Sequence, residues 1–412
     1  MDSTPAPAPS GAPSGGLPEV VTAGEPEIPS TAIDEPLRAV AGPLQLRRFT
    51  GLTLSPGRVG DPASARAFAR PYRVVPERLQ KWEQQGHLQR DKSPALYLHE
   101  YTASGMTVRG IVGALDVSRR VDPGQQPAVW PHEAIHRGQA RELAARMGQM
   151  ALNPAPILLV HRGTSELRTL IDGIAATEPD LSFTDHAQQR NRVWAIRSED
   201  QIDAINATLA GSQALIADGH HRYAAYLRLQ ESQSTDDVRA SSGEPLTDSG
   251  LAMLVDQADT PLFLGAIHRV LTGVRMRHIR SALADPATFT PMSRADALKA
   301  LDPETIVVTN GRHWASVGLG APSKSDQRIA VEQVHREIID RLRPRARRIN
   351  YHHSVEDTLE HLPSGAIAVL LPAPEFDQVR DLIRSGGLLP EKATSFQPKP
   401  SLGVLMRSLL AE

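Results

Sequence analysis

The spacing of apolar residues predicts short strands and helices along most of the chain. Residues 95–117 have two β-rich halves around Ser104-Gly105, which is the pattern of a hairpin. Between residues 133 and 150, apolar positions recur every three or four residues, which predicts a helix with Pro131 in its first turn. Further apolar runs predict strands at residues 157–160, 214–217, 306–309 and 367–371, and helices at residues 201–209, 221–230 and 329–342. This alternation predicts an α+β protein.

The start of the chain differs in composition from the rest. Residues 1–44 contain 9 of the 33 prolines, and no aromatic residue precedes Phe49. Such a Pro/Ala/Ser/Gly tract cannot bury enough apolar surface to offset its ordering entropy, so we expect a disordered tail. Residues 231–249 are polar and contain glycine, which is typical of a loop or boundary. We therefore expect one domain over residues 45–240 and a second, α/β domain over residues 241–412.

The overall composition excludes several function classes. The 412 residues carry a formal charge of -2, so we expect no overall positive electrostatic field that would attract nucleic acid. Only 4% of the residues are aromatic, too few for the side chains on which the bases of single-stranded nucleic acid stack. Cysteine is absent, which excludes thiolate nucleophiles, iron–sulfur clusters and disulfides. No run of about 18 apolar residues and no secretory signal pattern is found. We expect a cytoplasmic protein with a small-molecule substrate, no nucleic-acid partner and no membrane partner; the oligomeric state stays open.

The segment ALIADGHHRYAAYL, residues 214–227, is the strongest candidate for chemistry. It compresses a strand, an Asp-Gly turn and a helix start, and a helix N-terminus readily holds phosphate. Gly219 permits close backbone approach, and the side chains of His220, His221 and Arg222 supply hydrogen-bond donors. Asp218 can ligate magnesium or act as an acid or base. The alternative is that Asp218 only caps the helix and the histidines lie on the surface.

A second cluster, His132-Glu133-Ala134-Ile135-His136, matches H-E-x-x-H on the predicted helix. On a helix, this spacing puts two zinc-binding imidazoles on one face with the glutamate as a base. The longer metzincin motif fails because Gln139 and Glu142 occupy its Gly and third His positions, and no other third ligand is evident. A zinc hydrolase and a plain helix start both remain alternatives.

Two further segments carry charge near predicted strands. In residues 389–406, Lys392 and Lys399 lie among several prolines, which favour an extended segment. Either the two lysines bind an anion together, or the segment is a solvent-exposed edge. His268-Arg269 follows an apolar run and is expected to present donors at a strand end, or else to be ordinary surface. The pair His352-His353 stays unassigned.

These blocks resemble a widespread family of uncharacterised conserved proteins, the domain-of-unknown-function family numbered one thousand and fifteen. The matching blocks are GLTLSPGRVGD (51–61), PYRVV (71–75), PHE (131–133), ADGHHRYAAYL (217–227), HR (268–269) and LPEKATSFQPKPSLG (389–403). The chain departs from the family pattern at Arg73, where an acidic residue is usual, and at Ile135, where a threonine is usual.

A remoter similarity bears on mechanism. The order PHE, then Arg141 on a helix, then a strand from Pro156, then DGHHR looks like the core of the ParB/sulfiredoxin superfamily, in particular its free-serine kinases. The resemblance implies that Glu133 is the catalytic base, with His132 beside it. It also implies that the DGHHR residues bind nucleotide phosphates and a magnesium ion, the latter through Asp218. The two blocks are farther apart here, with residues 161–213 between them.

The sequence therefore favours a Mg²⁺- and nucleotide-dependent phosphotransferase, with ATP or ADP as the nucleotide and free L-serine as the expected acceptor. Phosphoryl transfer needs mainly positioning and charge neutralisation, which such residues supply. Neither GxxxxGK[ST] nor GxGxxG after a strand is present, so the nucleotide is expected to rest on the helix after Gly219. The alternative is a non-catalytic ParB-type nucleotide-binding module or switch.

Overall fold

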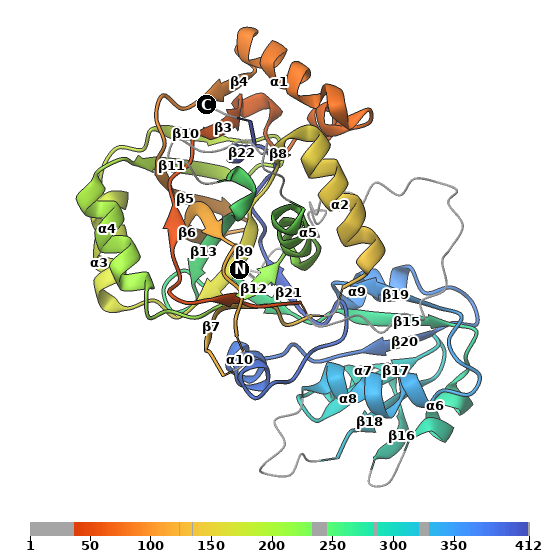
Figure 1. The fold of residues 1–412 in the computed structure, drawn as a ribbon. Coiled ribbons are helices and arrows are strands. Elements are labelled where there is room, and N and C mark those ends of the chain that lie inside the picture. The colour runs from red at the N-terminus through yellow and green to blue at the C-terminus, as the bar shows by residue number, and fades with distance from the viewer. Residues whose placement is uncertain are drawn as a thin grey trace, which may run out of the picture.

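A computed structural model describes residues 37–122, 124–133, 135–232, 245–283, 287–320 and 329–410. It is a mixed α+β structure (Figure 1), which confirms the predicted class at that level. Residues 1–36 of the predicted tail lie outside the described residues. Residues 37–44 instead belong to the folded part, because the strand Val40–Ala41 pairs with Pro127–Trp130 and Leu44 is buried.

The larger sheet contains the strands predicted in the first half of the chain. Strand β2 (Leu46–Arg47) pairs with β6 (Met106–Asp116) and stands outside the strand order given below. The predicted hairpin is confirmed as β5 and β6, joined by a turn in which Ser104 and Gly105 have φ of 50° and 79°. Gly105 meets this backbone demand without strain. In order across the sheet the strands are β1 (Val40–Ala41), β7 (Pro127–Trp130), β12 (Ala214–Asp218), β9 (Ile157–His161), β13 (Ser249–Asp256), β6 (Met106–Asp116), β5 (Leu96–Ala103), β11 (Arg190–Ile196) and β10 (Leu181–Thr184).

Strand β9 shows how this sheet divides the core. Its side chains alternate between two apolar clusters, with Ile157 and Leu159 in one and Leu158 and Val160 in the other, as the two-residue period of a strand requires. The first cluster lies under the helices α2 (Arg137–Met150), α3 (Ser165–Ala175), α4 (Glu199–Leu209) and α5 (His220–Glu231). Figure 1 shows α2 beside α5, and these two helices are in contact.

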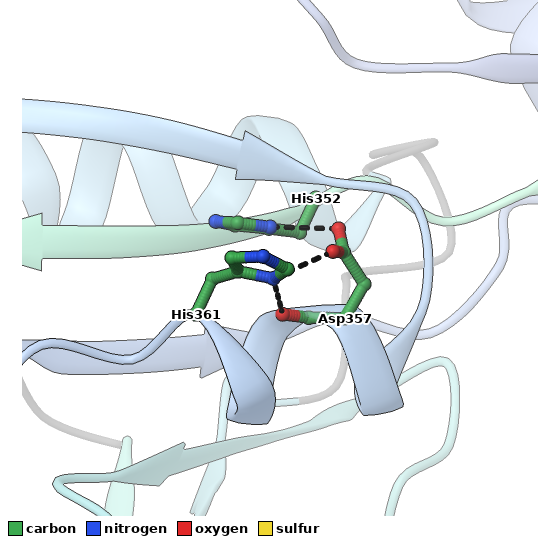
Figure 2. A group of neighbouring side chains, drawn as sticks. All are labelled: His352, Asp357 and His361. Carbon is green, nitrogen blue, oxygen red and sulfur yellow. Dashed lines mark hydrogen bonds and ion pairs between the residues drawn. The ribbon is translucent and has the colours of Figure 1, made fainter. Parts of the chain in front are cut away.

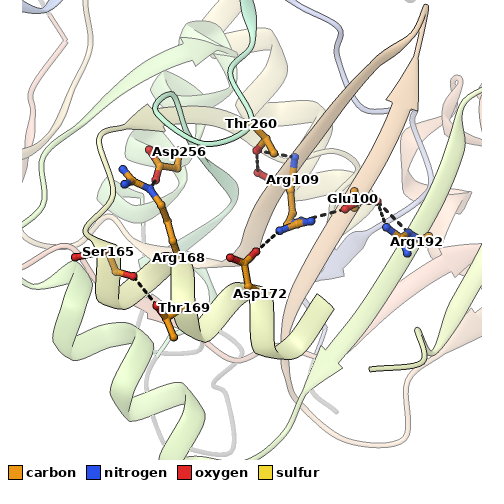
Figure 3. A network of polar contacts seen from close by, with 9 residues as sticks. All are labelled: Glu100, Arg109, Ser165, Arg168, Thr169, Asp172, Arg192, Asp256 and Thr260. Carbon is orange, nitrogen blue, oxygen red and sulfur yellow. Dashed lines mark hydrogen bonds and ion pairs between the residues drawn. The ribbon is translucent and has the colours of Figure 1, made fainter. Parts of the chain in front are cut away.

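A network of ion pairs ties α3 to the larger sheet (Figure 3). Arg168 on α3 donates to Asp256 at the end of β13 at 2.7 Å. Arg109 on β6 bridges Glu100 on β5 at 3.0 Å and Asp172 on α3 at 2.8 Å. Because Glu100 and Asp256 are buried, these contacts also satisfy carboxylates that would otherwise be costly to desolvate.

The smaller sheet is built from strands in the second half of the chain and includes the predicted strands at residues 306–309 and 367–371. The helix predicted over residues 329–342 is interrupted, because α8 ends at Glu337 and a 3₁₀ turn follows at Ile339–Arg341. In order the strands are β16 (Thr288–Met292), β18 (Trp314–Gly318), β17 (Thr305–Thr309), β20 (Ile367–Leu370), β15 (His268–Thr272) and β19 (Arg348–His352). Its helices are α6 (Met276–Ala282), α7 (Arg294–Lys299), α8 (Ala330–Glu337), α9 (Val355–Glu360) and α10 (Phe376–Arg384).

The chain crosses the expected boundary at residue 240 more than once. Strand β13 follows that boundary in sequence but lies inside the larger sheet. Strand β22 (Met406–Ser408), near the end of the chain, pairs with β3 (Gly51–Leu54) and β8 (Leu152–Asn153). Strand β21 pairs with β14 in a two-stranded ribbon. The segment between the smaller sheet and β22 thus returns to the first half of the chain. The remaining elements are α1 (Val75–Gln84), β3 (Gly51–Leu54), β4 (Leu88–Arg90), β8 (Leu152–Asn153), β14 (Phe263–Gly265), β21 (Ser395–Gln397) and β22 (Met406–Ser408). None of the described helices has the length and hydropathy needed to cross a membrane.

Candidate functional site

The PHE and DGHHR blocks meet because they follow neighbouring parallel strands. Strands β7 and β12 are paired in parallel, with Leu215 opposite Trp130. The carboxyl ends of parallel strands lie at the same edge of a sheet, so residues 131–136 and 218–222 emerge side by side. Gly219 has φ of 93° and ends the strand, and α5 begins at the next residue. The predicted strand–turn–helix is confirmed.

The histidines of α5 hold the PHE segment in an extended conformation. The backbone N–H of His132 donates to Nε2 of His220 at 3.4 Å, and the backbone N–H of His136 donates to Nε2 of His221 at 3.1 Å. The rings of His132 and His220 meet edge to face at 4.6 Å. Burial lowers the pKa of both to about 3, so both are neutral. In this structure His220 and His221 position a neighbouring segment, and a direct contact with phosphate stays a prediction.

This arrangement corrects the expected start of α2. The helix begins at Arg137, and Pro131 to His136 precede it. Leu389 pairs with the segment instead, through a bridge to Glu133 and a bond from its N–H to the carbonyl of His132 at 2.9 Å. The H-E-x-x-H match therefore does not lie on a helix face, and the premise of the zinc-hydrolase alternative is wrong. Nε2 of His136 lies 3.1 Å from a carboxylate oxygen of Glu391.

Glu133 is held by the C-terminal block of the chain. Its Oε1 accepts from the N–H of Ala393 at 3.1 Å, and from the N–H and hydroxyl of Thr394, both at 2.9 Å. The same hydroxyl lies 2.9 Å from Nε2 of His132. A hydroxyl has one proton, so donating it to Glu133 leaves the oxygen to accept from a protonated Nε2 of His132. Three donors converge on this one oxygen, which fixes the orientation of the carboxylate.

Asp218 is paired with two cations. Lys399 Nζ lies 2.5 Å from Oδ1, and Arg222 Nη2 lies 2.5 Å from Oδ2. Burial of Asp218 alone would raise its pKa, but the charges of Arg222 and Lys399 outweigh that effect and keep the pKa below its usual value. Arg222 also donates to the carbonyl of Pro156 at 2.6 Å. The carboxylate thus organises two cations at the start of α5.

The larger sheet holds Lys399 in place through the neighbouring backbone. The hydroxyl of Tyr101 on β5 donates to the carbonyl of Pro398 at 2.6 Å, and Nε2 of Gln189 donates to the carbonyl of Lys399 at 2.8 Å. Three distant parts of the sequence therefore meet at this lysine.

The smaller sheet supports the same segment from the other side. Arg269 is the second residue of β15 and is fully buried. It donates to the carbonyl of Lys392 at 2.9 Å and also to that of Ile267. His268 accepts from the N–H of Leu371 at 3.1 Å. The pair lies at the beginning of β15 and is buried, so it is not ordinary surface. Arg269 also donates from Nε to Nε2 of His335 at 3.4 Å, and the expected role of the pair in ligand binding stays a prediction. Arg269 positions Lys392, whose φ is 55°.

The site also includes residues that the sequence left unassigned. Nδ1 of His353 lies 2.9 Å from the hydroxyl of Ser395, and Thr394 links Glu133 to His132. The pKa of His353 lies below its usual value because of its partial burial and, after that, because of Lys399 and Lys392. Thr394 and Ser395 lie between Lys392 and Lys399 in the block that the sequence singled out, and this position is the signal that could have found them. Arg141 is exposed on α2, and no contact among the described residues joins it to the site.

A protein-held magnesium ion does not fit this arrangement. The expected ligand Asp218 has each oxygen paired with a cation, and Oε1 of Glu133 has three donors. A divalent cation beside Asp218 would face the charges of both Lys399 and Arg222. We derive no step through a metal at this position.

The fold and site define a mixed α+β protein with a polar cluster at the edge of its larger sheet, closed by a returning C-terminal segment. The chain belongs to the family described as "Protein of unknown function (DUF1015)", whose model matches residues 47–342. The matched range contains the PHE, DGHHR and HR blocks, whereas Lys392 and Lys399 lie beyond it.

Comparison with known proteins gives only distant likenesses. No curated protein matches the chain. Among solved structures, a free serine kinase in complex with AMP is 14% identical with a TM-score of 0.38, covering 68% of this chain and 88% of that one. SbnI with a C-terminal truncation, from Staphylococcus aureus, is 11% identical with a TM-score of 0.39, covering 72% and 87%. A conserved hypothetical protein from Pyrococcus furiosus is 14% identical with a TM-score of 0.37, covering 68% and 92%.

Proposed function

We propose that this protein is a nucleotide-dependent phosphotransferase acting on a small hydroxyl-bearing metabolite, with free L-serine as the expected acceptor. One observation carries the proposal: a single segment, residues 393–399, bonds Glu133 through Thr394 and Asp218 through Lys399. The expected base and the expected phosphate-binding residues therefore lie in one cluster. The ParB/sulfiredoxin-like core implied by the sequence belongs to the same proposal.

The geometry suits a base that must be ionised and oriented. Among the described residues, every hydrogen bond to the Glu133 carboxylate ends on Oε1, so we assign Oε2 to the acceptor hydroxyl. A positioned carboxylate that takes this proton contributes roughly 10²- to 10⁴-fold to the rate. Thr394 and the backbone around it then act as positioning residues, because they hold the carboxylate without contacting the acceptor.

The geometry also suits phosphate binding. Lys399 and Arg222 converge on Asp218 at the first turn of α5, where unpaired backbone N–H groups add partial positive charge. A phosphate carries more negative charge than one carboxylate, so it competes with Asp218 for these cations. Gly219 leaves room for this approach, because its missing Cβ would lie 3.0 Å from Nε of Arg222. We assign ADP or ATP as the nucleotide.

A non-catalytic nucleotide-binding module is the second candidate. It is favoured by the internal pairing of Asp218, because both of its carboxylate oxygens are already paired with cations without a substrate. The two candidates differ in turnover: a kinase forms phosphorylated acceptor continuously, whereas a switch binds nucleotide without acceptor-dependent chemistry.

The first test is binding of ADP, ATP and CTP, each followed by the rise in melting temperature, since ligand at 100 times its Kd adds about 2.7 kcal/mol to stability. The second is formation of phosphoserine from L-serine with the nucleotide that binds. We expect Glu133→Gln to keep nucleotide affinity while turnover falls roughly 10²- to 10⁴-fold.

Lys399→Gln tests the phosphate site. We expect nucleotide affinity to fall roughly 10- to 150-fold, the equivalent of one charge-assisted hydrogen bond. Lys299→Gln, an exposed lysine at the end of α7, is the matched control and should bind nucleotide like the wild type. Equal losses of nucleotide affinity in Glu133→Gln and Lys399→Gln would contradict the division of roles. Binding without any phosphorylated product, over a panel of small hydroxyl compounds, would support the second candidate instead.

A further inference from the structure

We propose that His352, Asp357 and His361 form a binding site for a divalent transition-metal ion of the zinc type. The three side chains point toward one another at the end of β19 and around α9 (Figure 2). One ligand atom from each lies within 4.8 Å of the others. Nδ1 of His352 is 2.7 Å from Oδ2 of Asp357, and Nδ1 of His361 is 2.8 Å from Oδ1.

The backbone presents this group without a metal. His352 is the last residue of β19, and two residues later the hydroxyl of Ser354 accepts from the N–H of Asp357 to cap α9. Asp357 lies in the first turn of α9, and His361 is the residue directly after the helix, whose N–H still donates to the carbonyl of Asp357 at 3.1 Å. This spacing of four residues brings the two side chains together. The end of a strand and the two ends of one short helix therefore supply all three ligands, and α9 is in contact with β15, β19 and β20.

The donor set selects the class of ion. Two imidazole nitrogens and one carboxylate suit Zn²⁺, Co²⁺ or Ni²⁺, whereas Mg²⁺ prefers oxygen ligands only. Zinc bonds of about 2.0–2.1 Å in a tetrahedron separate neighbouring ligand atoms by roughly 3.3 Å. The two nitrogen–oxygen distances are about half an ångström shorter than that, so an outward movement of the exposed Asp357 and His361 side chains by roughly this amount admits the ion. Nδ1 of His361 then gives up its 3.0 Å contact with the carbonyl oxygen of Asp357. The side chains of Asp357 and His361 are 45% and 60% exposed, which leaves the fourth coordination position to water.

The site has a structural consequence for its neighbour. His353 follows His352 directly and bonds the hydroxyl of Ser395. An ion that joins the end of β19 to α9 therefore fixes the turn that carries His353. The metal site is argued from its own geometry and does not depend on the phosphotransferase proposal.

The experiment measures Zn²⁺ binding to the full chain after treatment with a chelator, by competition with a chromogenic zinc indicator. We expect one Zn²⁺ per chain with micromolar or tighter affinity, a rise in melting temperature with Zn²⁺, and no rise with Mg²⁺. His361→Ala and Asp357→Asn should each weaken Zn²⁺ binding by at least about 100-fold. His313→Ala, another exposed histidine in the smaller sheet region, is the control and should bind like the wild type.

The melting temperature of each metal-free variant shows whether it is folded. If His361→Ala is unstable, Asp357→Asn still tests the site, because it keeps the size of the side chain and the backbone N–H that bonds to Ser354. Binding of Co²⁺ in place of Zn²⁺ gives a second readout, since its visible absorption spectrum reports the coordination number. The absence of stoichiometric binding at micromolar Zn²⁺ would overturn the proposal. So would wild-type affinity in both ligand variants, because the ion would then be bound by other residues.

Discussion

Replacing Thr394 by valine tests the link between the C-terminal segment and the PHE block. The hydroxyl of Thr394 donates to Glu133 and accepts from His132, while Thr394 and His132 are only 8% and 0% exposed. Valine has nearly the same shape but no hydroxyl. It removes one bond to a charged group and leaves Nε2 of His132 buried without a partner.

The magnitude follows from these two losses. A hydrogen bond to a charged group contributes about 1.5–3 kcal/mol, and an unsatisfied buried donor costs about 1–3 kcal/mol. Both bonds involve the same hydroxyl, so the two losses are not independent and do not simply add. We therefore expect Thr394→Val to lower the free energy of unfolding by about 2–4 kcal/mol. If the larger-sheet part of the chain, about 200 residues, unfolds as one unit, the melting temperature falls by roughly 5–12 °C.

Thr394→Ser is the matched control. It keeps the hydroxyl and deletes one methyl group, which costs about 1 kcal/mol. Calorimetry or circular dichroism at pH 7.5 measures both variants under reversible conditions. A melting temperature of Thr394→Val equal to that of Thr394→Ser would refute the reasoning, since the bridging hydroxyl would then contribute nothing to stability.

Two further predictions concern acid and glycine. Burial lowers the pKa of His132 and His220 to about 3, against 6.5 in the unfolded chain. As the pH falls, the unfolded state therefore binds more protons than the folded state, and each histidine should remove roughly 2 kcal/mol of stability between pH 7.5 and 5. Urea unfolding at pH 7.5, 6 and 5 measures this loss, and a midpoint that does not fall with acid would contradict it. Gly219→Ala places a Cβ 3.0 Å from Nε of Arg222 at φ of 93°, so we expect a loss of about 1–3 kcal/mol in thermal unfolding. Gly138→Ala in α2, whose Cβ meets nothing within 4 Å, should instead stabilise by about 0.5–1 kcal/mol, and equal effects of the two substitutions would count against the argument.

Local elements of this fold are readable from the sequence because their signals are local. The β5–β6 hairpin follows from two β-rich runs and a Ser-Gly turn, and α5 follows from an apolar strand that ends at Asp218-Gly219. The start of α2 is not readable in this way. Residues 132–136 have a helical spacing, but their backbone groups are taken by His220, His221 and Leu389, which are distant in sequence.

In the candidate site, too, the residues can be recognised from local sequence, whereas their contacts with one another cannot. Asp218, Arg222, Glu133 and Lys399 are recognisable as chemical groups from their blocks. Their mutual contacts depend on the parallel pairing of β7 with β12 and on the return of residues 389–399, neither of which has a local signal. For the same reason Arg269 looks like a ligand-binding group in sequence, whereas the fold buries it against carbonyls of the chain.

The returning segment makes the site one of the last features of the molecule to form during synthesis. A ribosome adds about 5–20 residues per second, and every strand of the larger sheet has been made once Asp256 has emerged. Glu133 then has no Thr394, and Asp218 has no Lys399, until the whole smaller sheet has also been translated. A nascent chain can therefore assemble its main sheet while the site stays open. The site closes only after residues 389–399 have been made.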